Sequence, residues 1–294
     1  MADKNTEKKN LEDYDSRMQT LIRIEMEKAE KRRKLLIGFL ALIAVGSLGY
    51  FGFYYATSSK SGGRFDELSD LVGSDALSNM DKDSGAGYIA SLSQKDNDEV
   101  TPEVLEKYRT LYNSNRDFIG WIKISDTVID YPVMQADDNE YYLSHNFDRK
   151  DDKAGCLFLD SKCDAVHGND NYIIYGHHLT SGRMFSSLSD YESESYYKKH
   201  PTITFDTIYE EGTYQVMYAF RSRVYDETDV NFKYYEFIDT DSDQEFNSYM
   251  NEMKGASYYD TGVTAVRGDK LLTLSTCDYK EENGRFVVVA KKIK

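Results

Sequence analysis

Hydrophobic residues in this chain form one long uninterrupted run near the N-terminus and a series of short runs after it. The long run extends from Leu35 to Ala56, 22 positions without a charged residue. A helix rises about 1.5 Å per residue, so this run would be about 33 Å long, enough to cross a hydrocarbon core of roughly 30 Å. The pattern therefore predicts one membrane-spanning helix over residues 35–56, and no other run in the sequence approaches this length.

The residues on either side of this run predict its orientation. Four consecutive basic residues at positions 31–34 precede it, whereas only Lys60 and Arg64 follow it closely. By the positive-inside rule, residues 1–34 are cytosolic and the large C-terminal part is extracellular. A cleaved signal peptide and a buried core helix are the alternatives. The run is longer than a usual signal-peptide core and no clear small-x-small cleavage site follows it, which favours an uncleaved signal-anchor.

The composition changes twice beyond the predicted anchor. Residues 57–88 are rich in Ser, Gly and Asp, which indicates a flexible linker with no more than one short helix. Residues 89–294 form the predicted extracellular domain, where short apolar and β-branched runs alternate with turn residues in a way typical of an all-β barrel or sandwich. The predicted strands are 118–124, 127–134, 155–160, 171–176, 202–207, 213–224, 270–276 and 285–293.

Three segments of this domain have helical patterns instead. Residues 102–112 follow Thr101 as a candidate N-cap with a proline in the first turn. Residues 181–191 form the second segment. Residues 242–255 form the third, in which four large apolar residues share one helical face: Phe246, Tyr249, Met250 and Met253.

The charge of the chain excludes one class of partner. The formal net charge is −15, with 36 basic and 51 acidic residues, and the acidic excess lies entirely beyond residue 60. A surface this anionic repels phosphate backbones, so nucleic-acid binding is excluded. Acidic side chains in such numbers are solvated surface, and no spacing of Cys and His residues indicates a metal site.

Cysteine usage draws attention to one thiol. The chain has three Cys, so an extracellular domain leaves at least one unpaired. Cys156 and Cys163 lie seven residues apart around a predicted turn; they either pair or serve as small apolar residues. Cys277 ends a predicted strand and is separated by a polar turn from Arg285, which opens the next one. If the two strands form a hairpin, the thiol and the guanidinium lie side by side at one end of the sheet.

A third chemically active group follows another buried strand. His177 and His178 come directly after Gly176, so an imidazole is presented at the rim of the sheet. A thiol with a free pKa of about 8.5 needs a base or a cation to become a thiolate near neutral pH, and Arg285 also offers donors to an oxyanion. The alternative is that Cys277, His177 and Arg285 are each satisfied locally and never meet.

These residues resemble the active-site signature of sortases, which are membrane-anchored cysteine transpeptidases of Gram-positive bacteria. The string from Thr273 to Cys277, with Arg285 opening a Val-rich strand, is similar to the catalytic motif, and Tyr175-Gly176-His177 is similar to the histidine segment. The segments DFIGWIKISDTVIDYPVMQ and DDNEYYLSHNFD resemble class B, as does the helical insertion over 242–255. The resemblance covers roughly residues 105–294. It implies a mainly β fold, a closed barrel of about eight strands with peripheral helices, preceded by one transmembrane helix.

The resemblance also implies roles for individual residues. Cys277 is expected to be the nucleophile, His177 the general acid and base, and Arg285 the stabiliser of the oxyanion or substrate, with His178 a bystander. Three further residues are expected to contact the substrate: Asn139, Leu143 and Ser275. The reaction needs no cofactor and no metal.

The implied reaction transfers a secreted protein to a cell-wall amine. Cys277 would cleave an Asn-Pro-x-Thr-like sorting motif after Thr, and a peptidoglycan precursor or cross-bridge amine would resolve the thioester. Expected partners are secreted proteins with the motif, the wall amine and the membrane, with the enzyme anchored there as a single-pass protein. Three alternatives stay open: a pilin polymerase with a Lys acceptor, a hydrolytic cysteine peptidase, and a catalytically silent membrane-tethered binding domain.

Overall fold

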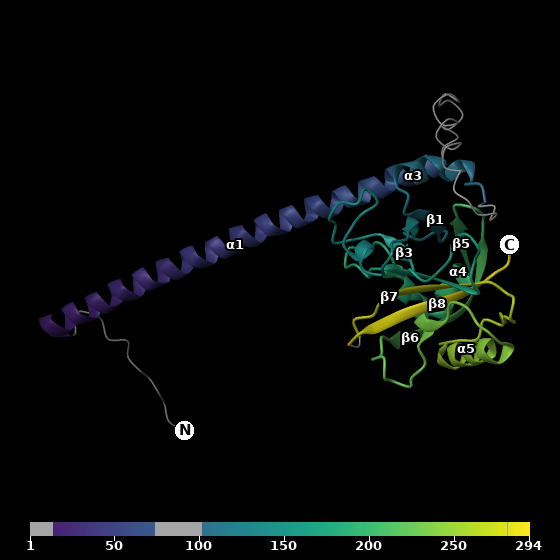
Figure 1. Cartoon of the computed structure of the whole chain (residues 1–294). Helices are drawn as coiled ribbons and strands as arrows, with labels where there is room; N and C mark the ends of the chain where they lie inside the picture. Colours follow the sequence, from purple (N-terminus) through teal and green to yellow (C-terminus); the bar gives the residue numbers. More distant parts are fainter. Residues whose placement is uncertain (1–13, 74–101, 281) are drawn as a thin grey trace, which may run out of the picture. The chain divides into compact units, whose positions relative to one another are not determined.

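The computed structural model describes residues 14–73, 102–280 and 282–294 of the chain (Figure 1). The chain separates into two compact units, residues 1–60 and residues 61–294. The boundary falls within one long helix, α1 (Ser16–Gly73).

In the first unit, α1 contains the predicted anchor. Its segment Ser16–Phe53 is long and apolar enough to cross a membrane, with a mean hydropathy of 2.1 over its best window and with none of that window buried in protein. A signal sequence near the N-terminus passes the same test, so this segment is a candidate anchor by length and composition. Residues 1–13 of the predicted cytosolic segment lie outside the described residues.

The second unit is built on an eight-stranded sheet that closes on itself, which confirms the predicted fold class. Its order is β1-β2-β3-β4-β7-β8-β6-β5, and all eight predicted strands are present within a few residues of their predicted limits. Most neighbours are antiparallel, but β2 with β3 and β4 with β7 run parallel. The strands are β1 (Phe118–Lys123), β2 (Asp130–Met134), β3 (Leu157–Leu159), β4 (Asn171–Gly176), β5 (Thr202–Thr207), β6 (Thr213–Arg223), β7 (Leu271–Cys277) and β8 (Gly284–Lys292).

Successive side chains of each strand point to opposite faces of the sheet, and the apolar ones form two hydrophobic clusters. The larger cluster takes residues from every strand and fills the interior of the barrel; from β7 it takes Leu272 and Leu274. The smaller cluster lies on the outer face of β6, β7 and β8, where Leu271 and Val287 meet the apolar side of α5 (Asp243–Ala256). Figure 1 shows α5 beside β6, with β7 and β8 lying next to each other. Odd-numbered residues of β7 therefore face outward, on the side covered by α5.

Each of the three predicted helical segments contains helix, but parts of two of them form 3-10 helix instead of α-helix. The pattern over 242–255 forms α5, whose N-cap Ser242 accepts a hydrogen bond from the backbone N–H of Glu245 at 3.2 Å. The segment 181–191 is helical only from Ser186, as a 3-10 helix, η5 (Ser186–Glu192), which is followed by α4 (Glu194–Lys199). The first segment is helical only from η3 (Glu106–Tyr108) through α3 (Arg109–Ser114), and its proposed N-cap Thr101 lies outside the described residues. Two more 3-10 turns are η4 (Tyr141–Leu143) and η6 (Tyr234–Glu236).

The end of α1 differs from the predicted linker. Residues 57–73 are helical, and the side chains of Phe65 and Leu68 are 4% and 1% exposed in the core of the second unit. Phe65 packs edge-on against Tyr131, and Arg64 makes two hydrogen bonds to Asp148. An apolar pair at i, i+3 spacing buries itself on one face of a helix, which explains why this stretch is ordered despite its Ser- and Gly-rich sequence. The rest of the predicted linker, 74–88, lies outside the described residues.

Candidate active site

The hairpin of β7 and β8 places Cys277 and Arg285 opposite each other. They are paired positions of the antiparallel register, so their side chains lie on the same face of the sheet. In such pairs the Cβ atoms are about 4.5–5.5 Å apart. Cys277 and Arg285 are both half-buried, so the thiol is accessible from solvent.

His177 reaches the same end of the sheet from the other side of β7. β4 runs parallel to β7 with Gly176 paired to Thr276, and the hydroxyl of Thr276 donates to the carbonyl oxygen of Gly176 at 2.8 Å. His177 and Cys277 are therefore the next residues of two adjacent strands, which lie about 4.8 Å apart. The three predicted catalytic residues come together at one end of β4, β7 and β8, and we refer to His177, Cys277 and Arg285 as the Cys–His–Arg set.

Close packing around Gly176 fixes the point at which His177 leaves the sheet. A Cβ atom on Gly176 would lie 2.3 Å from a methyl carbon of Leu157 and 2.8 Å from the ring of Phe185. No side chain fits at these distances without displacing its neighbours. The N–H of Phe185 also donates to the carbonyl oxygen of His177 at 3.0 Å, so the backbone on both sides of the imidazole is held.

The imidazole is oriented by the backbone of the η4 turn. Nε2 of His177 lies 2.7 Å from the carbonyl oxygen of Leu143. A carbonyl oxygen only accepts hydrogen bonds, so Nε2 carries a proton and Nδ1 is the nitrogen left to exchange one. Leu143 itself is 38% exposed. Gly155, with φ +59°, allows the η4 turn to pack closely, since a Cβ there would lie 2.3 Å from the carbonyl oxygen of Tyr142.

The guanidinium of Arg285 is folded back onto its own turn. One of its Nη atoms donates to the carbonyl oxygens of Asn283 and Gly284, at 3.3 and 2.9 Å. Asn283, the last residue before β8, adopts a left-handed conformation with φ +56°, which Asn tolerates better than most residues. These bonds hold the Arg285 side chain at the strand end, next to Cys277.

Ser275, a predicted substrate contact, lies two residues before Cys277 on the same face of β7. Its side chain is 1% exposed, and its hydroxyl is hydrogen-bonded to the hydroxyl of Tyr234 from η6 at 2.7 Å. Burial raises the pKa of Tyr234 to about 12, against the opposing effects of Ser275 and of the positive charge of Arg285. Both residues are buried and bonded to each other, so Ser275 reaches a substrate only if Tyr234 moves.

Asn139, another predicted contact, is held by two hydrogen bonds from its side chain. Its amide nitrogen donates to the carboxylate of Asp160 at 3.0 Å, and its oxygen accepts from the N–H of Ser161 at 2.8 Å. Asp160 also accepts a 2.9 Å bond from the hydroxyl of Tyr175, which is the register partner of Ser275 on β4. The half-buried Asn139 is thus linked through two residues to the strand that carries His177.

The other two thiols have a different environment. Cys156 and Cys163 are both free and buried, so the structure contains no bond between them. Burial raises the pKa of Cys156 well above its ordinary value and raises that of Cys163 to about 12. Both therefore serve as small apolar residues, one of the two alternatives that the sequence left open.

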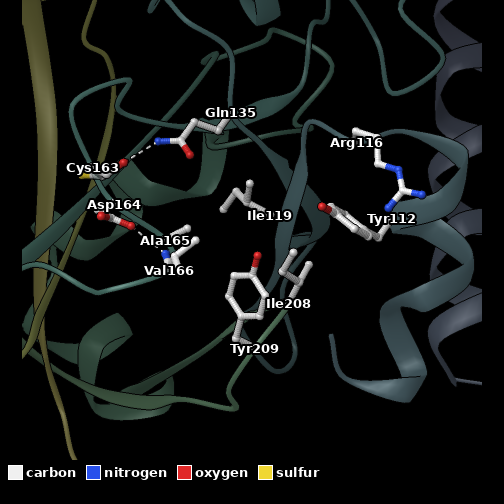
Figure 2. A pocket seen from close by; sticks show the side chains of 10 residues that line it. All are labelled: Tyr112, Arg116, Ile119, Gln135, Cys163, Asp164, Ala165, Val166, Ile208 and Tyr209. Carbon is white, nitrogen blue, oxygen red and sulfur yellow. Dashed lines mark hydrogen bonds between the residues drawn. The ribbon is translucent and has the colours of Figure 1, made fainter. Parts of the chain in front are cut away.

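A cavity of about 370 Å³ lies at the other end of β4 (Figure 2). Cys163 lines it and contacts the carbonyl oxygen of Asn171, the first residue of β4, whereas His177 follows the last. Figure 2 shows Tyr112 and Tyr209 around the central Ile119. A six-residue strand separates this cavity from the Cys–His–Arg set, so the cavity is not the catalytic centre. Within the part of the chain that the structure describes, no three His, Cys, Asp or Glu side chains are grouped to hold a metal ion.

Sequence reasoning missed two contributors to the site. Tyr234 lies in a segment with no strand or helix pattern, so nothing indicated that it would pack beneath Ser275. Arg221, inside the apolar strand β6, contacts Asp278, the residue after Cys277. An arginine directly after the buried positions of an apolar strand was a usable signal, because such a charge requires a partner.

Comparison with known proteins agrees with this geometry. The sortase domain family matches residues 122–293 of the chain. Sortase B of Staphylococcus aureus (strain NCTC 8325 / PS 47) is 36% identical over 205 residues, which are 69% of this chain and 80% of that protein. A Staphylococcus aureus sortase B–substrate complex has a TM-score of 0.65 at 30% identity, covering 81% of this chain and 99% of that one. A sortase B complexed with triglycine has a TM-score of 0.64 at 30% identity, with the same coverage. The chain therefore belongs to the sortase family, as a class B-like cysteine transpeptidase.

Proposed function

We propose that Cys277 is the nucleophile of this transpeptidase, His177 its general acid and base, and Arg285 the group that stabilises the oxyanion. The observation that carries the proposal is the register of three adjacent strands, which brings the three side chains to one end of the sheet. A cation and an imidazole beside a half-buried thiol are the conditions under which a thiolate forms.

In the first half-reaction, the Cys277 thiolate attacks the carbonyl carbon of a Thr residue and Arg285 donates to the oxygen that becomes negative. The C–N bond then breaks, and the departing amine takes a proton from the imidazolium of His177. Because Nε2 remains bonded to the carbonyl oxygen of Leu143, the proton leaves from Nδ1. The products are a thioester on Cys277 and a free amine.

In the second half-reaction, an amine attacks the thioester carbonyl and gives its proton to Nδ1 of His177. The C–S bond breaks, Cys277 leaves as a thiolate, and a new amide bond remains on the Thr carbonyl. The imidazolium and the thiolate are restored together, so the cycle consumes no cofactor.

The substrate side of the proposal draws on the relatives. One similar structure is a sortase B–substrate complex and another contains triglycine. We infer that the substrates are secreted proteins with an Asn-Pro-x-Thr-like motif and that the acceptor is a peptidoglycan precursor or cross-bridge amine. Asn139, Leu143 and Ser275 remain the proposed groove residues. The basic residues 31–34 favour a cytosolic N-terminus, with the catalytic unit outside the cell.

The experiment incubates the detergent-solubilised full chain with a sorting-peptide library and candidate amines, triglycine among them. Mass spectrometry is expected to find a thioester on Cys277 and a product joined to the amine after Thr. Cys277→Ala should abolish both. Arg285→Lys should be severely impaired, because an ammonium cannot reproduce the planar donor fork.

The rival functions give different products. A hydrolytic peptidase yields the free acid whether or not an amine is added, and a pilin polymerase prefers a Lys side chain on a second protein. A silent binding domain forms no thioester at all. Any of these results replaces the proposed wall-anchoring reaction, and near-normal turnover of Arg285→Lys would make Arg285 a structural residue.

A further inference from the structure

The residue that follows the nucleophile carries a negative charge. Asp278 extends from the end of β7 on the opposite side of the strand from Cys277, and its side chain is 11% exposed. An unneutralised carboxylate at this position would disfavour the Cys277 thiolate, since like charges repel, and would offer Arg285 a competing partner.

Arg221 reaches this carboxylate from β6, which is separated from β7 by β8 in the sheet. Nε of Arg221 donates to Asp278, and the two Nη atoms donate to the two carboxylate oxygens of Glu192 at 2.8 Å each. The guanidinium centre lies 5.5 Å from the ring centroids of Tyr258 and of Phe286, its own register partner on β8. Arg221 is thus fixed by two carboxylates and two rings, and its side chain is 21% exposed.

The turn after Cys277 is tied to the same group of charges. Nζ of Lys280 donates to Glu192 at 3.2 Å, and the N–H of Lys280 donates to Asp278 at 3.1 Å. Bonds from Arg221 and Lys280 lower the pKa of Glu192 to about 2. On the other side of the turn, the hydroxyl of Tyr279 donates to the carbonyl oxygen of His178 at 2.9 Å.

We propose that Arg221 is a positioning residue that neutralises Asp278 and holds the turn after β7, so that Arg285 remains available to Cys277. The inference rests on the proposed role of Cys277 as nucleophile. It gives Arg221 an electrostatic function that differs from packing, because a neutral side chain of similar size would fill the space but leave the charge of Asp278 uncompensated.

The other charged or titratable groups around Cys277 do not change in the test. They are Arg285 from β8, His177 and His178 after β4, Tyr234 from η6, Tyr279, Lys280 and Glu282 in the turn, and Glu192 from η5. A change in the reactivity of the thiol when Arg221 is replaced therefore reports the charge of Asp278.

The test measures the rate of Cys277 alkylation by iodoacetamide against pH, in the full chain in detergent. In Arg221→Gln the midpoint of the profile is expected to rise by about one pH unit, the size expected when a neighbouring negative charge loses its partner. The double variant Arg221→Gln with Asp278→Asn is expected to restore the wild-type midpoint. With a sorting peptide, Arg221→Gln should lower kcat while KM changes little, and Arg221→Lys should recover part of the loss.

Glu192→Gln is the matched control, because it loosens Arg221 and Lys280 but leaves Asp278 paired. Three outcomes would each overturn the inference. The first is a midpoint shift in Glu192→Gln equal to that in Arg221→Gln. The second is an unchanged midpoint in Arg221→Gln, and the third is a double variant whose midpoint stays shifted from the wild-type value. If Arg221→Gln does not fold, Asp278→Asn alone is decisive: it is expected to keep the midpoint at or below the wild-type value, and a rise contradicts the inference. Failure of the wild-type thiol to react would instead contradict the proposed function.

Discussion

The 2.7 Å contact between Nε2 of His177 and the carbonyl oxygen of Leu143 decides which ring nitrogen is available for chemistry. It also separates two histidines that the sequence places side by side. Nδ1 of His178 is buried without a hydrogen-bond partner within the described part of the chain, and its ring packs edge-on against Tyr279. Of the two imidazoles, that of His177 is oriented by a hydrogen bond beside the thiol, and that of His178 serves packing.

Separate alanine substitutions test this assignment. His177→Ala is expected to lower the rate of acyl transfer by about 10²–10⁴-fold, the usual contribution of a general acid and base. His178→Ala should stay within a few-fold of the wild-type rate, since its backbone bond to Tyr279 does not need the ring. The measurement is turnover of a sorting peptide with an added amine, and the reverse order of the two variants would exchange their roles.

The three thiols are expected to differ in reactivity as their burial differs. Cys163 has its pKa raised from about 9 to about 12 by burial, and the pKa of Cys156 is also raised, so both stay protonated in the folded chain at pH 8. Iodoacetamide at pH 8 should therefore label Cys277 alone, and label all three thiols in urea. The folded chain keeps the proton of the Cys163 thiol to a higher pH than the unfolded chain does. The contribution of Cys163 to the free energy of unfolding is therefore complete below about pH 9 and is lost as the pH rises toward 12. Peptide mapping after labelling of the folded chain checks the prediction, and modification of Cys163 at pH 8 contradicts it.

At the scale of elements, the short apolar and β-branched runs and the turn residues between them were sufficient to predict all eight strands of the sheet. They also predicted the β7–β8 hairpin, because a Cys at a strand end and an Arg opening the next strand are separated by a short polar turn. The parallel pairing of β4 with β7 was not predictable in this way, since it joins strands about 100 residues apart and depends on closure of the whole sheet. The position of His177 next to Cys277 was therefore implied by resemblance alone.

The end of α1 shows what composition alone does not reveal. The Ser- and Gly-rich stretch indicated a linker, but Phe65 and Leu68 bury themselves against the barrel and keep the helix ordered to Gly73. Two apolar residues are too few for a periodic signal, and their burial depends on a surface formed by distant strands. The hydrogen bond between Ser275 and Tyr234 was not predictable for a similar reason, because Tyr234 lies in a segment without a local pattern.

Phe65→Ala tests whether this helix end is part of the folded unit. Removing a buried phenylalanine is expected to lower the free energy of unfolding by about 3–5 kcal/mol. Leu71→Ala, at a position 42% exposed on the same helix, is the control and should change it by less than about 1 kcal/mol. Urea denaturation of the full chain reports both through Trp121, the single tryptophan of the sequence, whose indole N–H donates to Asp130. If Phe65→Ala also changed the free energy of unfolding by less than about 1 kcal/mol, residues 61–73 would not be needed for stability.

At the scale of the whole molecule, the distribution of charge separates the two sides of the predicted anchor. Residues 31–34 are all basic and directly precede the apolar run, while the acidic excess of the chain lies beyond residue 60. Basic residues are retained on the cytosolic side during insertion, whereas acidic ones contribute little to orientation. The same arrangement would place the Cys–His–Arg set where secreted substrates and wall amines are both present.

Labelling of intact protoplasts tests this orientation with the reactive thiol as the probe. A membrane-impermeant maleimide is expected to modify the wild-type chain from outside, because Cys277 is the half-buried thiol and the other two are buried. Cys277→Ala should remain unlabelled, which identifies the site of modification. If the catalytic unit were cytosolic, labelling would require lysis of the protoplasts, and if the anchor were cleaved, the labelled protein would appear in the medium. Replacing the basic residues at 31–34 by Gln should lower the labelled fraction, because the charge difference that fixes the orientation is then lost.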